Sequence, residues 1–518
     1  MTRLLSSDPL QTITAPPISY HALAPVLIVL GAALVSVLAE ALLPRASRFS
    51  AQVAITLLGL GAALVTVGTL HGTRVTTASR ALSIDGVGLF LQGSILLMAM
   101  LSVLLMAERS IDVGSPIVAS AAVVVGSPAD RRLSQSDQVQ TEVFPLALFA
   151  VSGMLIFPIS NNLLLMFIAL EVMSLPLYLM AGMARRRRLL SQEAAMKYFL
   201  LGAFASAFFL YGLALLYGYA NSVDLPKLFL ASRQSGQSDV LLYVGLALLL
   251  VGLLFKAGVA PFHSWTPDVY QGSPTPVTAF MASCTKVAAF GAILRVLYVG
   301  FSSLAWTWRP IVWAVAIASM GVGALFGLTQ LNVKRMLAYS SIAHAGFLLV
   351  ALVAVSQASV SAVLFYLLTY GIATLAAFGL LMVVRDGDGE ATQLSQWSGL
   401  ARKSPAVAAI MTILLLSMAG IPLTAGFIGK FVVFRAAIHT AGPLVVIALI
   451  CSAIAAFFYL RIVVVMYFAE PPENSPTIAI PGWSTTIALT FGVVVTVVLG
   501  IFPQPLLDLA DKAANLVG

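Results

Sequence analysis

The sequence predicts an all-α polytopic membrane protein with about fourteen transmembrane helices. Of its 518 residues, 60% are hydrophobic and 9% are charged, whereas about 25% are charged in ordinary globular domains. The apolar runs are continuous over the roughly 20 residues that a helix needs to cross a bilayer. They do not alternate between apolar and polar residues as the strands of a membrane barrel do.

The candidate spans follow one another along almost the whole chain. In order, they are 22–43, 51–70, 85–107, 142–159, 161–183, 191–220, 240–260, 276–300, 309–330, 334–356, 358–384, 405–438, 441–469 and 482–502. The stretch 405–438 is too long for one straight crossing. The first 20 residues are polar and lack the pattern of a cleaved signal peptide, so the first span is expected to direct insertion.

The basic loop residues predict the orientation. Loops after odd-numbered spans carry more Lys and Arg than the opposite loops, including the Arg run at 185–188. By the positive-inside rule these loops are cytoplasmic, and both termini face outward. The Arg run is interpreted as a topology anchor, with a nucleic-acid or partner patch as the alternative. The segment 108–141 is expected to be a long cytoplasmic loop, and no role is assigned to it.

Two spans contain glycine and proline breaks. KAGVAPFH at 256–263 contains Gly258 and Pro261, and SMAGIPLT at 417–424 contains Gly420 and Pro422. The prolines lie 161 residues apart, and the same shift superposes three consecutive spans on three later ones. The unit is five helices, an odd number, so the second copy enters the membrane inverted. Broken helices in inverted repeats are typical of secondary transporters.

This repeat divides the chain into five parts. They are an N-terminal three-helix segment (1–107), the loop (108–141), a first inverted repeat (142–300), a second inverted repeat (301–470), and a final helix with the C-terminal segment (471–518).

Four lysines fall inside the predicted spans: Lys197, Lys256, Lys286 and Lys430. A charge in mid-bilayer costs at least about 2.5–3.5 kcal/mol, so such residues face a bundle interior or a wet cavity and are functional candidates. For Lys197 a local pair with Glu193, four residues earlier, is the alternative. Arg295, Arg435 and Arg461 lie nearer the span ends and are expected to reach the membrane surface.

Glu171 is an isolated acid in mid-membrane, and Pro176 follows it in the same span. Beside buried lysines it predicts a switchable pair, with a static clamp between helices as the alternative. His344 lies ten residues into its span and suits a proton relay, although a buried histidine can also serve only as hydrogen-bonded structure. His263 and Lys334 are secondary candidates.

The residue types favour protons over metal ions. Lysine and histidine are poor ligands for Na⁺, which prefers oxygen. Cys284 and Cys451, the two cysteines, lie inside apolar spans, and no metal, disulfide or iron–sulfur site is expected. No GxGxxG fingerprint, CxxC pair or pair of mid-span histidines indicates a redox cofactor. The formal net charge of +8 is explained by the loop arginines and lysines, so no nucleic-acid partner is expected.

Four stretches carry a family resemblance: KAGVAPFHSWTPDVYQGSPTPV, EAAMKYFLLGAFASAFFLYG, KRMLAYSSIAHAGFLLVAL and LLLSMAGIPLTAGFIGKF. They resemble the antiporter-like subunits of proton-pumping NADH:quinone oxidoreductase (respiratory complex I), and WTPDVYQGSPTPV is most similar to the subunit N branch. The resemblance covers nearly the whole chain from about residue 22. The histidine in SSIAHAG favours the bacterial respiratory version over the photosynthetic one.

The resemblance implies site residues. Glu171 and Lys256 match the family's glutamate–lysine pair, while Lys197, Lys286 and Lys430 match further family lysines; with His344 they form a hydrophilic axis.

The resemblance also implies a proton-translocating membrane-arm subunit in a bacterial cell membrane, moving protons from cytoplasm to exterior. NADH, FMN, iron–sulfur clusters and a quinone are expected in other subunits, with no cofactor bound by this chain. Its partners are the other membrane-arm subunits and membrane lipid. A subunit of an autonomous Na⁺(K⁺)/H⁺ antiporter of the related multi-subunit type is the alternative.

Overall fold

The computed structural model of the chain describes residues 18–111, 115–118, 123–124, 127–129, 132, 139–233, 239–387, 389–472 and 476–517. The expectations for the N-terminal 17 residues, and for most of the 108–141 loop, lie outside this part of the chain.

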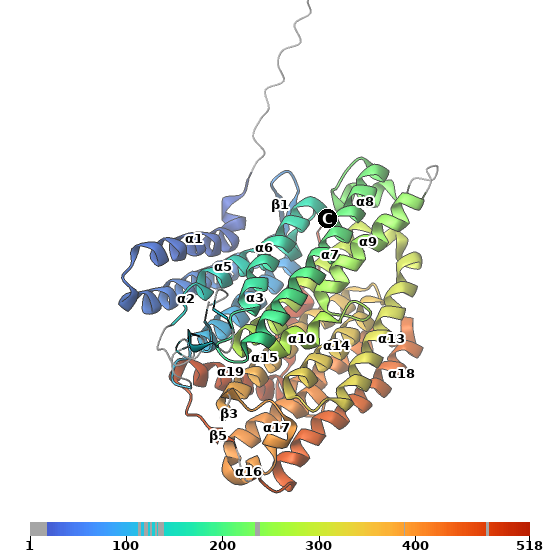
Figure 1. Ribbon diagram of the computed structural model, residues 1–518. Helices are drawn as coiled ribbons and strands as arrows, with labels where there is room; N and C mark the ends of the chain where they lie inside the picture. Colours follow the sequence, from blue (N-terminus) through green and yellow to red (C-terminus); the bar gives the residue numbers. More distant parts are fainter. Residues whose placement is uncertain are drawn as a thin grey trace, which may run out of the picture.

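The described chain is a bundle of helices (Figure 1). The α-helices are α1 (Tyr20–Leu42), α2 (Arg45–Thr69), α3 (Gly86–Met106), α5 (Val143–Ile156), α6 (Leu163–Ala181), α7 (Arg188–Ala220), α8 (Leu225–Ala231), α9 (Val240–Ala257), α10 (Trp265–Gly272), α11 (Thr275–Phe280), α12 (Lys286–Arg295), α13 (Ala305–Thr329), α14 (Val333–Leu352), α15 (Gln357–Val383), α16 (Leu400–Lys403), α17 (Pro405–Ala419), α18 (Ala425–Phe468), α19 (Trp483–Ile501) and α20 (Gln504–Ala513). The shorter turns are the 3₁₀ segments η1 (Phe157–Ile159), η4 (Ser302–Leu304) and η5 (Leu394–Trp397) and the π-helical segments η2 (Met281–Thr285) and η3 (Val296–Gly300).

Twelve helical segments of the described chain are long and apolar enough to cross a membrane. Two shorter apolar helices, Val143–Ile159 and Pro405–Ala419, coincide with further predicted spans. The prediction of an all-α polytopic membrane protein is confirmed. The most buried segments are Thr275–Gly300 and α15, which are apolar on every side and therefore suit the centre of the bundle. Helices α1 and α2 are more exposed and lie at its edge (Figure 1).

Two helices end at the predicted breaks. Helix α9 ends at Gly258 (φ 71°) and α17 ends at Gly420 (φ 86°), both left-handed positions that glycine adopts without a Cβ penalty. The chain turns through Pro261 or Pro422 and then resumes as α10 or α18. Helix α18 is itself kinked at Ala441 (φ −143°, ψ 41°), so its 44 residues contain the end of one predicted span and all of the next.

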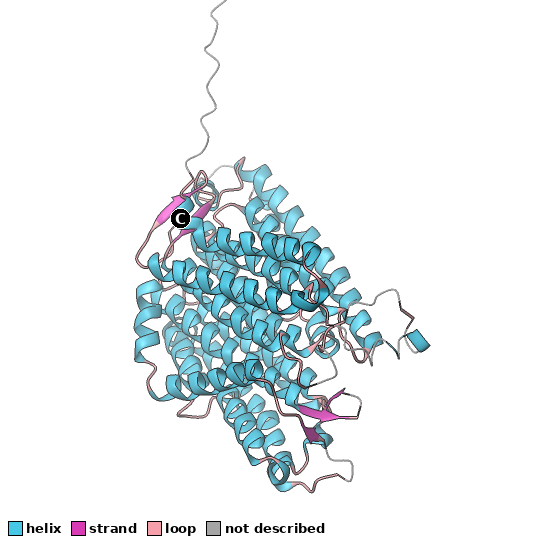
Figure 2. Cartoon of the chain, turned by 90° about the vertical axis from the view of Figure 1, so that its left-hand side faces the viewer, coloured by secondary structure: helices cyan, strands magenta, loops and turns pink. Residues whose placement is uncertain are grey.

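Short strands lie at opposite ends of the molecule. Strands β1 (Val75–Thr77) and β2 (Leu82–Ile84) form an antiparallel hairpin. At the other end, β3 (Val384–Asp386) pairs antiparallel with both β4 (Gly389–Glu390) and β5 (Thr477–Ile478) (Figure 1). The C-terminal end of the chain returns to the β1–β2 hairpin (Figure 2), where the backbone oxygen of Val517 accepts a hydrogen bond from Ser83 Oγ at 2.8 Å.

Candidate functional site

Lys256 lies in the last turn of α9, directly before the first break. Its side chain is buried, with 3% of the residue exposed, and its Nζ donates to Ser174 Oγ (2.8 Å) and Tyr198 Oη (3.2 Å). Tyr198 is fixed by stacking on Trp265, with ring centroids 4.6 Å apart. Because hydroxyl oxygens can both donate and accept, this setting can hold a charged or a neutral lysine.

Glu171 lies on α6, one turn before Ser174. Among the described residues it forms no ion pair with Lys256, and its Oε1 is buried without a hydrogen-bond partner. Ser174 therefore occupies the position on Lys256 that the predicted glutamate–lysine pair would use. Glu171 and Ser174 are three residues apart and share one face of α6, so the acid lies beside the serine that binds Lys256 but forms no ion pair with that lysine.

Lys286 begins α12, immediately after the π-helical turn η2 (Met281–Thr285). Its Nζ donates to the backbone oxygen and to the hydroxyl of Ser341, both at 2.6 Å. The ammonium also lies 5.9 Å from the ring centre of Tyr370. Lys286 is thus held by neutral groups of α14 and α15, and it has no carboxylate partner among the described residues.

His344, on α14, is enclosed by aromatic side chains. Its Nδ1 lies 2.6 Å from Tyr366 Oη and its Nε2 lies 3.1 Å from Tyr459 Oη, while its ring stacks on Tyr370 with centroids 4.2 Å apart. Tyr459 Oη also shares a hydrogen bond with Ser340 Oγ. Both ring nitrogens of the histidine therefore have a hydroxyl partner, which is the arrangement that a proton relay requires.

Lys430 lies on α18, beside the second break. Its Nζ donates to the backbone oxygen of Ala419 (2.9 Å) and to Ser452 Oγ (2.8 Å). The oxygen of Ala419 is available because α17 ends at Gly420 and leaves its last carbonyl groups without helical partners. The lysine at the second break thus binds one backbone carbonyl oxygen and one hydroxyl, whereas the lysine at the first break binds two side-chain hydroxyls.

The sites on the second half of the chain approach one another. Ser341, which binds Lys286, is the sequence neighbour of Ser340, which bonds to the tyrosine beside His344. Phe347 links the last two sites, because its ring packs edge-on against His344 and lies 5.1 Å from Lys430 Nζ.

Several buried polar atoms along this path have no protein partner among the described residues, namely Glu171 Oε1, Thr266 Oγ1, Tyr370 Oη and Thr374 Oγ1. Internal water is the partner that such groups ordinarily take. We call Glu171, Lys256, Lys286, His344 and Lys430 the central axis.

Lys197 is more exposed than the lysines of the central axis. Its side chain is 42% exposed, and its Nζ contacts Glu193 and Asp268, both at 2.6 Å. Asp268 also binds Arg335 at 2.5 Å, so the aspartate joins α7, α10 and α14. The sequence reasoning missed Asp268. The signal was present, since it is the only acid in WTPDVYQGSPTPV.

The two secondary candidates lie at the start of α14 and in the turn after α9. Lys334, at the start of α14, donates to the backbone oxygen of Ser273 and to Thr275 Oγ1, and its Nζ lies 3.5 Å from Glu390 Oε2. His263 lies in the turn between α9 and α10, and its Nδ1 is buried without a partner among the described residues.

Arg295 was expected to reach the membrane surface, and this expectation was wrong. Its side chain is fully buried, and its Nη2 donates to both carboxylate oxygens of Asp85, at 2.9 and 2.8 Å. Its remaining nitrogens donate to Pro158 O, Asn161 Oδ1 and Val517 O. A buried guanidinium requires such a complete set of acceptors, which explains why it lies inside the bundle.

The described residues contain no group of three or more His, Cys, Asp or Glu that could hold a metal ion. Cys284 and Cys451 are buried as free thiols.

Comparison with known proteins gives a consistent family. Residues 160–487 match the family model described as NADH:quinone oxidoreductase/Mrp antiporter, TM. The NADH-quinone oxidoreductase subunit N of Saccharopolyspora erythraea is 57% identical over 504 residues, which is 96% of this chain and 98% of that one.

Two solved structures have the same fold. A chain of respiratory complex I from Thermus thermophilus is 36% identical, with a TM-score of 0.74 over 93% of this chain and 98% of that one. A chain of the Mrp complex from Dietzia sp. has a TM-score of 0.81 over 96% of this chain and 97% of that one, but at 21% identity it shows only a shared fold. The chain belongs to the NADH:quinone oxidoreductase/Mrp antiporter family, within its branch of NADH-quinone oxidoreductase subunits N.

Proposed function

We propose that this chain translocates protons across the bacterial membrane as a membrane-arm subunit of NADH-quinone oxidoreductase. NADH oxidation and quinone reduction take place in other subunits, which hold NADH, FMN, the iron–sulfur clusters and the quinone. The observation that carries the proposal is the chemistry of the buried cations. Lys256, Lys286 and Lys430 bind hydroxyl or carbonyl oxygens and, among the described residues, no carboxylate. A proton can therefore leave or join each lysine without breaking an ion pair.

The central axis provides the proposed route. Protons pass between Lys286 and Lys430 through the hydroxyl cluster around His344, with internal water at the buried polar atoms that lack protein partners. Lys197, with Asp268 and Arg335, is assigned to the half-exposed approach to this route instead of its centre.

Glu171 supplies the switch in this proposal. In one state Lys256 binds Ser174 and Tyr198, as in the structure, and Glu171 is unpaired. In the other, Glu171 pairs with Lys256 and stabilises its charged form. A charge in a neighbouring subunit that attracts Glu171 would shift this equilibrium, because the two states differ in their interaction with that charge.

The same proposal includes an orientation and a domain organisation. Both termini face outward, and the helices of 142–300 and 301–470 form two inverted five-helix units. Two glycines in the left-handed conformation, one at the end of α9 and one at the end of α17, support the two inverted units. The outward termini are supported by the opposite end of the molecule, where β3, β5 and α16 lie together with nearby arginines and lysines (Figure 1).

The alternative, an autonomous Na⁺(K⁺)/H⁺ antiporter, shares the fold, and the likeness to the Mrp complex goes no further than the fold. Full-length identity of 57% to a subunit N favours complex I. Co-purification decides between them, since the antiporter would assemble without NADH-oxidising activity.

The direct test is proton pumping in Lys286→Ala and Lys256→Ala enzymes that are shown to assemble. We expect fewer protons translocated per NADH, because each change interrupts the axis. Lys227→Ala is the matched control, since this lysine is exposed and pairs with Asp224 outside the bundle. An unchanged ratio of protons to NADH in both axis variants would remove these lysines from the pathway.

A further inference from the structure

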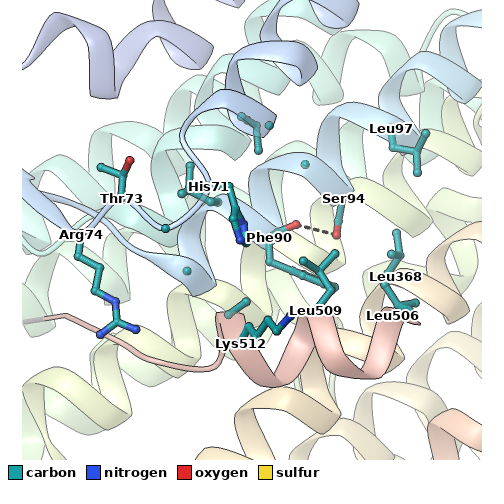
Figure 3. Close-up of a pocket in the computed structure, with 17 residues that line it drawn as sticks. His71, Thr73, Arg74, Phe90, Ser94, Leu97, Leu368, Leu506, Leu509 and Lys512 are labelled. Atoms are coloured by element: carbon teal, nitrogen blue, oxygen red, sulfur yellow. Dashed lines mark hydrogen bonds between the residues drawn. The ribbon is translucent and has the colours of Figure 1, made fainter. Parts of the chain in front are cut away.

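A second feature of the molecule lies away from the central axis. A cavity of about 640 Å³ opens between the end of α2, the start of α3, α15 and α20 (Figure 3). Its two ends differ in chemistry. His71, Arg74 and Lys512 lie toward one end, and Leu97, Leu368 and Leu506 lie toward the other (Figure 3). The shape and the polarity are those of a site for an amphiphile.

The cationic end is not neutralised by the protein. Among the described residues, the side chains of His71, Arg74 and Lys512 form no ion pair or hydrogen bond. The two acids on α20, Asp508 and Asp511, accept hydrogen bonds from Gln504 and Ser361 and form no ion pair with these three residues. The positive charge therefore faces the cavity without a counter-ion and favours an anionic ligand.

The apolar end fits a thin, flexible chain. Gly93 lies in its wall, and a Cβ at that position would meet only Val67 Cγ1, at 3.6 Å, so the space in front of it is open. The volume is within the range of about 300–1,000 Å³ of ordinary ligand sites. A transmembrane helix, about 10 Å across, would fill it within roughly two turns. An acyl chain can occupy its length.

We propose that this cavity binds an anionic phospholipid. Its phosphate lies among His71, Arg74 and Lys512, and one acyl chain follows the leucines at the other end of the cavity. Basic pockets between transmembrane helices bind anionic lipid headgroups for the same electrostatic reason. Because the cavity lies between α20 and α3, the lipid fastens the amphipathic α20 to the bundle and fills a gap that the protein alone leaves open.

The test is a titration of delipidated, assembled enzyme with phosphatidylglycerol, with phosphatidylcholine as the neutral comparison and bound lipid counted by mass spectrometry. Neutralising both cations with Arg74→Gln and Lys512→Gln should weaken phosphatidylglycerol binding about thirtyfold, or roughly fivefold for each cation. Arg80→Gln is the matched control. This arginine is exposed on the same hairpin but does not line the cavity, so its variant should bind as the unchanged enzyme does.

A second variant keeps the charges and fills the apolar end. Gly93→Leu adds a side chain that extends into the cavity and raises helix propensity in α3, so it should remove lipid binding and leave the enzyme folded. Equal binding of the two lipids, or unchanged binding in both the charge and the Gly93 variants, would overturn the proposal. So would a map of the assembled enzyme in which a neighbouring subunit fills the cavity.

Discussion

The hydroxyl group of Tyr459 shows how a single residue can matter to the route. It is the one described group that contacts both His344 Nε2 and Ser340 Oγ, and Ser340 adjoins the serine that binds Lys286. Its position on α18 also places it in the second half of the chain, together with Lys430. The hydroxyl therefore connects His344 to the serine pair that binds Lys286.

Tyr459→Phe removes this oxygen and keeps the ring. We expect proton translocation per NADH to fall severalfold, because His344 loses one of its two hydroxyl partners, while assembly stays intact. Proton uptake in proteoliposomes, measured together with quinone reduction, checks this. Tyr211→Phe, at an exposed position on α7, is the control. A Tyr459→Phe enzyme that pumps normally would show that the route avoids this hydroxyl.

The buried Asp85–Arg295 pair gives a prediction about stability. Asp85→Ala leaves a buried guanidinium without its counter-ion, which costs about 3–5 kcal/mol in comparable cases. We expect a clearly lower thermal unfolding temperature of the purified complex. Replacing both residues, as Asp85→Leu with Arg295→Met, should recover much of the loss because no lone charge remains. If the double variant were less stable than Asp85→Ala, the unpaired charge would not be the cause.

At the scale of elements, the end of the broken helix α17 supplies a backbone carbonyl oxygen to the site. Gly420 ends α17 in a left-handed conformation, and its neighbouring carbonyl group binds Lys430. A side chain at Gly420 would approach Lys430 Cδ to 2.9 Å. The break and the lysine are therefore one unit, and the glycine cannot change without moving the cation.

Gly420→Ala should accordingly destabilise the chain by about 1–2 kcal/mol through backbone strain alone, and should also lower proton pumping by displacing Lys430. Gly442→Ala is the matched control, because Gly442 lies on α18, the helix that carries Lys430, and a Cβ there meets nothing within 4 Å. In Gly420→Ala both the thermal unfolding temperature and proton pumping should fall, and in Gly442→Ala neither should change. Normal pumping in Gly420→Ala would separate the break from the lysine.

Over the whole molecule, hydrogen bonds join segments that are far apart in the sequence. The loop after α3 is fastened to the start of α19 by Glu108, whose carboxylate accepts from the backbone N–H groups of Ser110 (2.7 Å) and Gly482 (2.9 Å). Burial on its own would raise the pKa of Glu108, but the hydrogen bonds from Ser110 and Gly482 outweigh it, and the pKa is lowered below its usual value.

This shift gives a pH dependence. A carboxylate with a lowered pKa in the folded state stabilises the fold above its unfolded pKa, and the contribution is lost as the pH falls through the folded value. Glu108→Gln should therefore be less stable than the unchanged protein at neutral pH, with the difference shrinking as the medium becomes acidic. Unfolding temperatures across that pH range provide the measurement. A difference that grows on acidification would contradict this account.

Much of the fold could be predicted from sequence because apolar length and Gly/Pro breaks are local properties. Lys286, Lys430 and His344 could be found as candidates in the same way, because a polar residue in the middle of a span avoids lipid by facing the interior of the bundle. The side-chain partners of buried charged residues could not be predicted from the sequence. Asp85 and Arg295 are 210 residues apart and each lies near a span end, so no local pattern joins them. The half-exposed setting of Lys197 likewise depends on how α7 packs against α10.

The contact of Val517 with the Asp85–Arg295 pair has a consequence for how the chain is made. Val517 N donates to Asp85 and Val517 O accepts from Arg295, although the ribosome adds Val517 222 residues after Arg295 and 432 after Asp85. The interior charge centre is therefore incomplete throughout most of synthesis. A chain shortened before residue 517 lacks the N–H group that donates to Asp85 and the carbonyl oxygen that accepts from Arg295. Such a chain keeps the contacts of Arg295 with Asp85, Pro158 and Asn161 but leaves one guanidinium N–H group without its acceptor.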